Sequence, residues 1–189
     1  MQSVNPFSGE VIKNYSEYTS NEVNTIIEEV DAAFQQWKLT GIEYRANLMR
    51  NLQSVLLKNK EELAGIIVAE MGKVKREALG EIEKCATVCS FYADNAASFL
   101  INEAIHTEAS VSYVSYRPLG TILAVMPWNF PFWQVFRFLA PALMAGNTGV
   151  LKHAGNVPGC ALAIERLVRE AGFPENVFRT LLIGSAKVK

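Results

Sequence analysis

Two short segments contain most of the side chains that could take part in chemistry. Pro127-Trp128-Asn129-Phe130-Pro131 follows one short apolar run, and Lys152-His153-Ala154-Gly155-Asn156 closes a second. The side chain of Asn129 can both donate and accept hydrogen bonds, and directly before a helix such a residue usually caps free N–H groups. Lys152 supplies a positive charge. The two segments are therefore the first candidates for a binding site.

Arg137 is a third candidate, because it interrupts the otherwise apolar stretch 132–139. It could pair with a nearby acid, or lay its stem on the surface with its charge in water. It could also clamp a ligand carboxylate with two parallel hydrogen bonds. About two helical turns, or ~12 Å of helical rise, are expected between it and Asn129.

The three cysteines have a simpler interpretation. Cys85 and Cys89 are one helical turn apart, and Cys160 stands alone. A metal site would need a second pair of ligands, and no Cys or His pair in the sequence completes one. We predict reduced core thiols and no metal.

Charge and composition narrow the class of protein. Lys plus Arg (18) nearly balances Asp plus Glu (19), and half of the residues are hydrophobic. This balance argues against nucleic acid or an anionic membrane as a partner. No apolar run is long enough to span a membrane, and the residues after Met1 do not resemble a signal segment. A cytoplasmic location is expected.

The first hundred residues predict an arm and four helices. Residues 1–18 indicate an extended arm with a turn. Thr19 and Glu22 have capping-box spacing, and apolar residues then recur at helical period as far as Trp37. Two further helices are expected between residues 44 and 71, the second ending at Gly72, and a long one from Val74 to about Leu100.

The rest of the sequence predicts alternating strands and helices. Residues 111–116 suit an exposed or edge strand, and 120–126 a strand covered on both faces. Helix 132–145, strand 148–152, helix 158–171 and strand 177–183 follow. The fold class is thus α/β, with a helical layer (1–103), projecting β-strands (104–117) and a first βαβαβ half of a dinucleotide-binding sheet (118–189).

Ligands of such sheets bind beyond the carboxyl ends of the strands, where both candidate segments lie. The glycine-rich phosphate fingerprint is missing from the first turn, and a bulky turn bracketed by Pro127 and Pro131 replaces it. A pyrophosphate is therefore not expected on that turn in the usual way.

The turn strongly resembles the same pentapeptide of the aldehyde dehydrogenase superfamily. The resemblance continues through 141–147, the strand ending in Lys152, and 171–177, and it covers essentially the whole chain. In that family the residue matching Asn129 donates its amide to the oxyanion formed when a Cys thiolate attacks the aldehyde. Such a donor can contribute roughly 3 kcal/mol. The resemblance favours this catalytic role over the cap.

The resemblance also implies a nicotinamide cofactor, NADP or NAD. Residues Met126, Pro127, Trp128 and Asn129 are expected to line its nicotinamide side, and Lys152 to bind the adenosine ribose. The family usually continues with Pro, a small residue and Glu, whereas this chain has His153, Ala154 and Gly155. Without that Glu we expect NADP to be accepted. His153 is interpreted as a surface residue that could contact a phosphate.

By resemblance, Arg137 points to succinic semialdehyde as the substrate of the parent enzyme, with Phe130 beside it in the substrate site. The family's catalytic Cys and Glu lie beyond Lys189. The chain is therefore expected to be an inactive N-terminal fragment of an enzyme that works through a Cys thiohemiacetal.

Alternatives stay open at this point. The chain could be a stand-alone nucleotide-binding or oligomerising module, or could belong to a dehydrogenase of another aldehyde. Self-association is expected in either case, through the stretch 104–117, which matches the family's oligomerisation strands, or through a raw sheet edge at the third strand.

Overall fold

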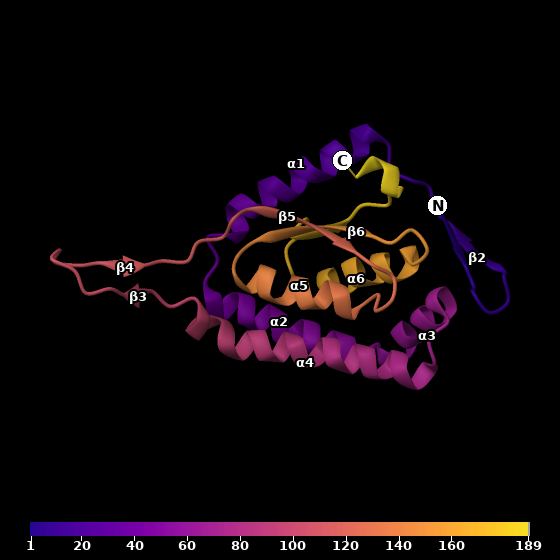
Figure 1. Cartoon of the computed structure of the whole chain (residues 1–189), viewed down its shortest axis with the longest axis horizontal. Helices are drawn as coiled ribbons and strands as arrows, with labels where there is room; N and C mark the ends of the chain where they lie inside the picture. The colour runs from indigo at the N-terminus through magenta and orange to yellow at the C-terminus, as the bar shows by residue number, and fades with distance from the viewer. Residues whose placement is uncertain (189) are drawn as a thin grey trace.

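The computed structural model describes residues 1–188; Lys189, the last residue of the expected dinucleotide-binding half, lies outside them. Helix α1 covers one face of a small parallel sheet, α5 and α6 cover the other, and α2 and α4 pack outside α5 (Figure 1). The helices are α1 (Ser20–Trp37), α2 (Ile42–Lys58), α3 (Lys60–Met71), α4 (Lys75–Phe99), α5 (Trp133–Met144) and α6 (Pro158–Glu170). The mixed α/β fold predicted from the sequence is confirmed.

Local signals account for the first helices. The arm forms a hairpin of β1 (Gln2–Val4) and β2 (Val11–Asn14). Thr19 and Glu22 form the reciprocal capping box at the start of α1. Gly72 ends α3 with φ of 73°, a left-handed conformation that glycine adopts without strain. The N-terminal helices do not all lie on one side of the sheet. Ile26 and Val30 of α1 pack against the strands from the side opposite to α2 and α4.

The sheet has the order β5-β6-β7, all parallel, with β5 (Thr121–Met126), β6 (Thr148–His153) and β7 (Phe178–Thr180). Every residue of the central strand β6 is buried. The expectation that β5 is covered on both faces is wrong, because Leu123 and Val125 are 54% and 55% exposed. Strand β7 is shorter than expected, and its Phe178 and Thr180 are buried. Both β5 and β7 are edge strands of this sheet, and the exposed apolar side chains lie on β5.

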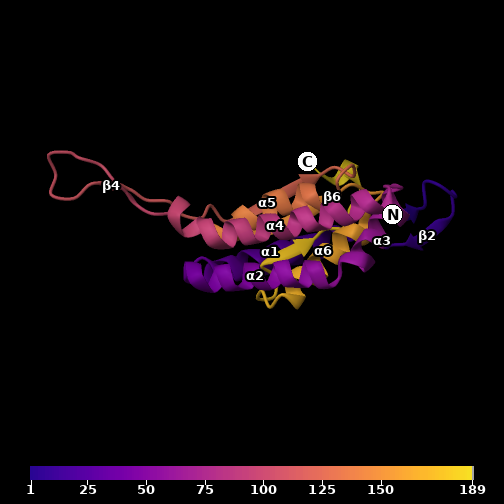
Figure 2. The ribbon, with the colours of Figure 1, turned by 90° about the horizontal axis from the view of Figure 1, so that it is seen from below.

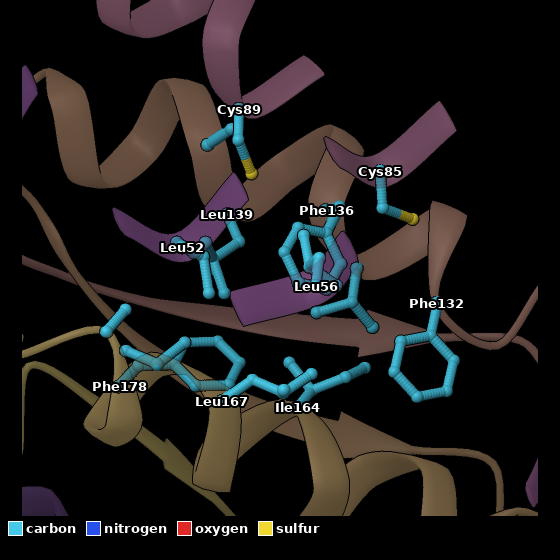
Figure 3. Close-up of a cluster of buried hydrophobic side chains, with 14 of the residues drawn as sticks. Leu52, Leu56, Cys85, Cys89, Phe132, Phe136, Leu139, Ile164, Leu167 and Phe178 are labelled. Carbon is cyan, nitrogen blue, oxygen red and sulfur yellow. The ribbon is translucent and has the colours of Figure 1, made fainter. Parts of the chain in front are cut away.

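One apolar core joins the helical layer to the sheet. Side chains from α2, α4, the start of α5, α6 and β7 converge in it; Figure 3 labels Leu52, Leu56, Cys85, Cys89, Phe132, Phe136, Leu139, Ile164, Leu167 and Phe178. The end of β5 and the start of α5 are thereby fixed to a rigid support, and the proposed site residues lie at this junction.

A long hairpin projects from the body between α4 and β5 (Figures 1 and 2). Within it only β3 (Glu103–Ala104) and β4 (Tyr113–Val114) pair as strands, and they are antiparallel. The strand expected over 111–116 is thus reduced to two residues. Apolar side chains of the hairpin, among them Val111 and Tyr113, are exposed.

Candidate functional site

The segment 127–131, called here the Asn129 loop, connects β5 to α5 without regular secondary structure. The side chain of Asn129 is exposed and makes no hydrogen bond within residues 1–188. The alternative that Asn129 caps the next helix is wrong. The backbone N–H groups of Phe132 and Trp133 donate instead to Oε1 of Glu81, at 2.9 and 3.0 Å. The Asn129 amide is therefore free to donate to a ligand.

Both helix N-termini behind the sheet edge are occupied by the chain's own carboxylates. Glu81 caps α5 as described, and Glu70 accepts hydrogen bonds from the N–H groups of Gly159 and Cys160 in α6, both at 2.8 Å. Helix N-termini are the usual anion sites of dinucleotide-binding folds. Because a buried carboxylate occupies each helix N-terminus, neither can bind a pyrophosphate. This agrees with the absence of the glycine-rich phosphate motif from the turn before α5.

Lys73 and Glu81 form a buried ion pair beneath the Asn129 loop. The Lys73 ammonium also donates to the Asn129 carbonyl at 3.4 Å and lies 3.8 Å from the centre of the Phe130 ring. Sequence reasoning missed both residues. The available signal was an acid at residue 81 on the buried stripe of α4, where Ala78 and Cys85 face the core.

His153 braces the same loop from the neighbouring strand. Its Nε2 lies 2.8 Å from the Pro131 carbonyl, and its Nδ1 accepts from the N–H of Ala154 at 2.8 Å. The ring is therefore a neutral donor at Nε2. Burial lowers its pKa below the usual 6.5, the Pro131 hydrogen bond opposing the shift. The expectation that His153 is a surface residue is wrong, because it is buried.

Lys152 lies on the opposite face of β6, in a groove of about 490 Å³ on the α1 side of the sheet. The groove is lined mostly by apolar side chains, including Leu123, Val150 and Leu181, with Lys187 at its rim. Lys152 is buried, and its ammonium makes one hydrogen bond, to Ser185 Oγ at 3.3 Å. No carboxylate of residues 1–188 pairs with it. A buried cation with spare donors suits a polar or anionic ligand.

Arg137 lies on α5 with its side chain exposed and forms no ion pair within the described part of the chain. Pairing with a nearby acid is thus excluded there. The prediction that two helical turns separate Arg137 from Asn129 is wrong, because the helix begins only at Trp133 and residues 129–132 precede it. The helical part of the chain between the two residues, from Trp133 to Arg137, rises by only about 6 Å.

The three thiols are placed for packing. Cys85, Cys89 and Cys160 are free and buried. Burial raises the pKa of each, and the charge of Glu70 adds to the effect at Cys160. Thiolates, not thiols, are nucleophiles, so none of the three is suited to attack a carbonyl. Within residues 1–188 no group of three or more His, Cys, Asp or Glu could hold a metal ion, and no helix is long and apolar enough to cross a membrane.

Apart from Arg137 on α5, the predicted site residues thus fall into two groups. Met126, the Asn129 loop and His153 form one connected unit, since the N–H of Ala154 also donates to the Met126 carbonyl at 3.0 Å. Lys152, which pairs with Val125 in the sheet register, lies apart from this unit in the groove on the α1 side. Gly155 is exposed beside the first group.

Comparison with known proteins places this geometry in a family. The sequence model of the aldehyde dehydrogenase family matches residues 1–189. A probable NADP(+) succinate-semialdehyde dehydrogenase of Synechocystis is 48% identical over 96% of this chain and 40% of its own length. The chain therefore spans about two fifths of this curated relative.

Solved structures agree. The succinic semialdehyde dehydrogenase of Streptococcus pyogenes, crystallised with NADP+, superimposes with a TM-score of 0.95 at 32% identity, over 99% of this chain and 41% of that one. A betaine aldehyde dehydrogenase of Staphylococcus aureus in complex with NAD+ gives 0.92 at 25% identity, over 98% and 38%. The full-length match to the family and these superpositions lead to one conclusion: the chain belongs to the aldehyde dehydrogenase family.

Proposed function

We propose that the chain forms the N-terminal part of an NAD(P)-dependent aldehyde dehydrogenase whose complete form oxidises succinic semialdehyde to succinate. The observation that carries this proposal is the exposed, unengaged amide of Asn129 at the carboxyl end of β5, with the capping of α5 taken over by Glu81. The names of the relatives from Synechocystis and Streptococcus support the choice of substrate.

In this proposal Asn129 donates its side-chain N–H to the oxyanion that forms when a thiolate adds to the aldehyde. A preorganised donor at such a position is worth on the order of 10²–10³ in rate. The nucleophile and the base come from the part of the enzyme that follows this chain, because the three thiols here are buried with raised pKa values. The chain alone is then inactive.

The residues at the sheet edge fit one side of a nicotinamide cofactor. Lys152 in its groove suits the hydroxyls of the adenosine ribose or a 2′-phosphate, and residues 153–155 contain no acid that would repel the phosphate. We therefore propose that NADP is accepted as well as NAD. The bound nicotinamide would accept a hydride from the substrate carbon.

The other predicted cofactor residues have distinct tasks in this proposal. Met126, Pro127 and Trp128 line the nicotinamide side, with Ala154 and Gly155 at the adjoining turn. His153 holds the turn through its Pro131 hydrogen bond instead of contacting phosphate, because both of its ring nitrogens are engaged. The pyrophosphate is bound by the following part of the enzyme, since Glu70 and Glu81 occupy the helix N-termini here.

Arg137 and Phe130 are proposed to recognise the substrate. The guanidinium of Arg137 has no acidic partner within the described residues and can form a bidentate pair with the far carboxylate of a four-carbon semialdehyde. The ring of Phe130 is held in the loop by the Lys73 ammonium.

The test uses the complete enzyme that contains this chain. We expect oxidation of succinic semialdehyde with NADP, and a fall in kcat of roughly 10²–10³ on replacing Asn129 with Ala. The affinity for NADP, measured by fluorescence titration, should change little. An Asn129→Ala enzyme with unchanged kcat would refute the oxyanion role, and no oxidation of any aldehyde would refute the proposed function.

A further inference from the structure

The Asn129 loop is tied to the start of α4 by one lysine. The Lys73 side chain is 5% exposed. Its ammonium pairs with Glu81, donates to the Asn129 carbonyl at 3.4 Å and lies 3.8 Å from the Phe130 ring centre. Two of these three contacts are therefore made to consecutive residues of the loop.

The second member of the pair holds the chain directly after the loop. The Glu81 side chain is 1% exposed. Its Oε2 accepts from Lys73, and its Oε1 accepts from the N–H groups of Phe132 and Trp133. Lys73 and Glu81 together thus hold the chain at Asn129 and from there into the first turn of α5. The left-handed Gly72 permits this, because it ends α3 and turns the chain directly into Lys73.

Stability alone does not account for the lysine. Buried ion pairs contribute little net stability compared with apolar residues of similar volume, because desolvation offsets the attraction. Capping does not require a lysine either. Glu70 also accepts from two N–H groups at the start of a helix, one at each carboxylate oxygen, and has no ion-pair partner within residues 1–188. What Lys73 adds is the connection to the loop.

We propose that Lys73 and Glu81 are positioning residues, which hold the Asn129 loop so that the Asn129 amide points at the developing oxyanion. This inference rests on the proposed function. Misplacement of a catalytic group by about 1 Å can cost on the order of 10² in rate. The pair would therefore act on kcat through Asn129, without touching the substrate.

A double-mutant cycle in the complete enzyme tests the coupling. We expect Lys73→Met to lower kcat by roughly 10- to 100-fold, and Lys73→Arg, which keeps the charge, to restore part of it. In an Asn129→Ala background, Lys73→Met should lower kcat by less than about twofold, because residues that act as a unit are not additive. Equal losses in the two backgrounds would overturn the proposal.

Hydrogen exchange separates the positioning role from the proposed function. In this chain, Lys73→Met should speed amide exchange at Phe132 and Trp133, whose N–H groups donate to Glu81, whereas Glu70→Gln, which weakens the cap of α6, should leave those residues unchanged. Exchange that does not respond to Lys73→Met, or to the milder Lys73→Arg if the first variant does not fold, would sink the positioning role. If Asn129→Ala leaves kcat unchanged while exchange responds, the oxyanion role fails and the bracing of the loop stands.

Discussion

At the scale of single residues, Arg137 is the sharpest test of substrate choice. Its guanidinium is exposed and unpaired within residues 1–188. A charge-assisted bidentate contact contributes about 1.5–3 kcal/mol. In the complete enzyme, Arg137→Leu should therefore raise KM for succinic semialdehyde by roughly 10- to 100-fold. KM for an uncharged aldehyde of similar length should change little, and equal increases for both aldehydes would exclude a carboxylate clamp.

His153 predicts how stability depends on pH. Burial lowers its pKa in the folded chain below 6.5, so below that pH the unfolded chain binds the proton more readily. The contribution of His153 to stability is thus complete above about pH 6.5 and is lost as the pH falls. Urea unfolding between pH 8 and 5.5 should show this loss in the parent chain and a flatter profile in His153→Gln.

The other histidine provides the control for that measurement. His106 lies exposed in the projecting hairpin, so His106→Gln should retain the parent profile. A profile that flattens with His106→Gln instead of His153→Gln would contradict the assignment.

The sequence predicts where the candidate site residues lie in the fold, but not which residues support them. The strand-end position of the Asn129 loop and of Lys152 follows from apolar runs that stop at Met126 and Leu151. The burial of His153 and its hydrogen bond to Pro131, by contrast, arise where two separate strand-end segments meet in the fold. Lys73 contacts the loop from 56 residues away in sequence, and Glu81 contacts the residue after it from 51 residues away. Local patterns carry no information on such pairings.

At the scale of elements, two glycines of the α3 region should respond in opposite ways to the same change. Gly72 has φ of 73°, and an added Cβ would lie 3.0 Å from Cγ of Pro6 in the arm. Gly72→Ala should therefore lower the free energy of unfolding by about 1 kcal/mol or more. Gly65 is inside the helix and its added Cβ meets nothing within 4 Å, so Gly65→Ala should raise it by about 0.5–1 kcal/mol. The denaturant midpoints of the two variants measure these changes. A lower stability of Gly65→Ala, or an unchanged stability of Gly72→Ala, would contradict this account.

Helix boundaries followed the sequence because caps and stops are local. Thr19 with Glu22, and Gly72, act through neighbours in the chain, and the structure confirms both. The coverage of strand β5 is a tertiary property, and its apolar run alone could not reveal that Leu123 and Val125 stay exposed. The shortness of β4 has the same origin, since residues 111–116 have no further strand beside them in the projecting hairpin.

At the scale of the whole molecule, two apolar surfaces are open. One is on β5, where Val125 is exposed and Leu123 is exposed beside the groove that contains Lys152. The other is the projecting hairpin, with exposed Val111 and Tyr113. Sequence alone predicted association through the hairpin or the third strand. Strand β7 is an edge strand, as β5 is, but the exposed apolar side chains lie on β5.

These surfaces predict how this chain associates in solution. Strand β5 pairs only with β6 within the described residues, so one row of its backbone N–H and C=O groups is free beside exposed apolar side chains. Such an edge promotes pairing between copies, and a lysine placed on it opposes that pairing. In sedimentation velocity the chain should therefore associate with rising concentration, and Val125→Lys should shift it towards monomer more than Val111→Lys does. The reverse order would assign the association to the hairpin, and a monomer at all concentrations would exclude both surfaces.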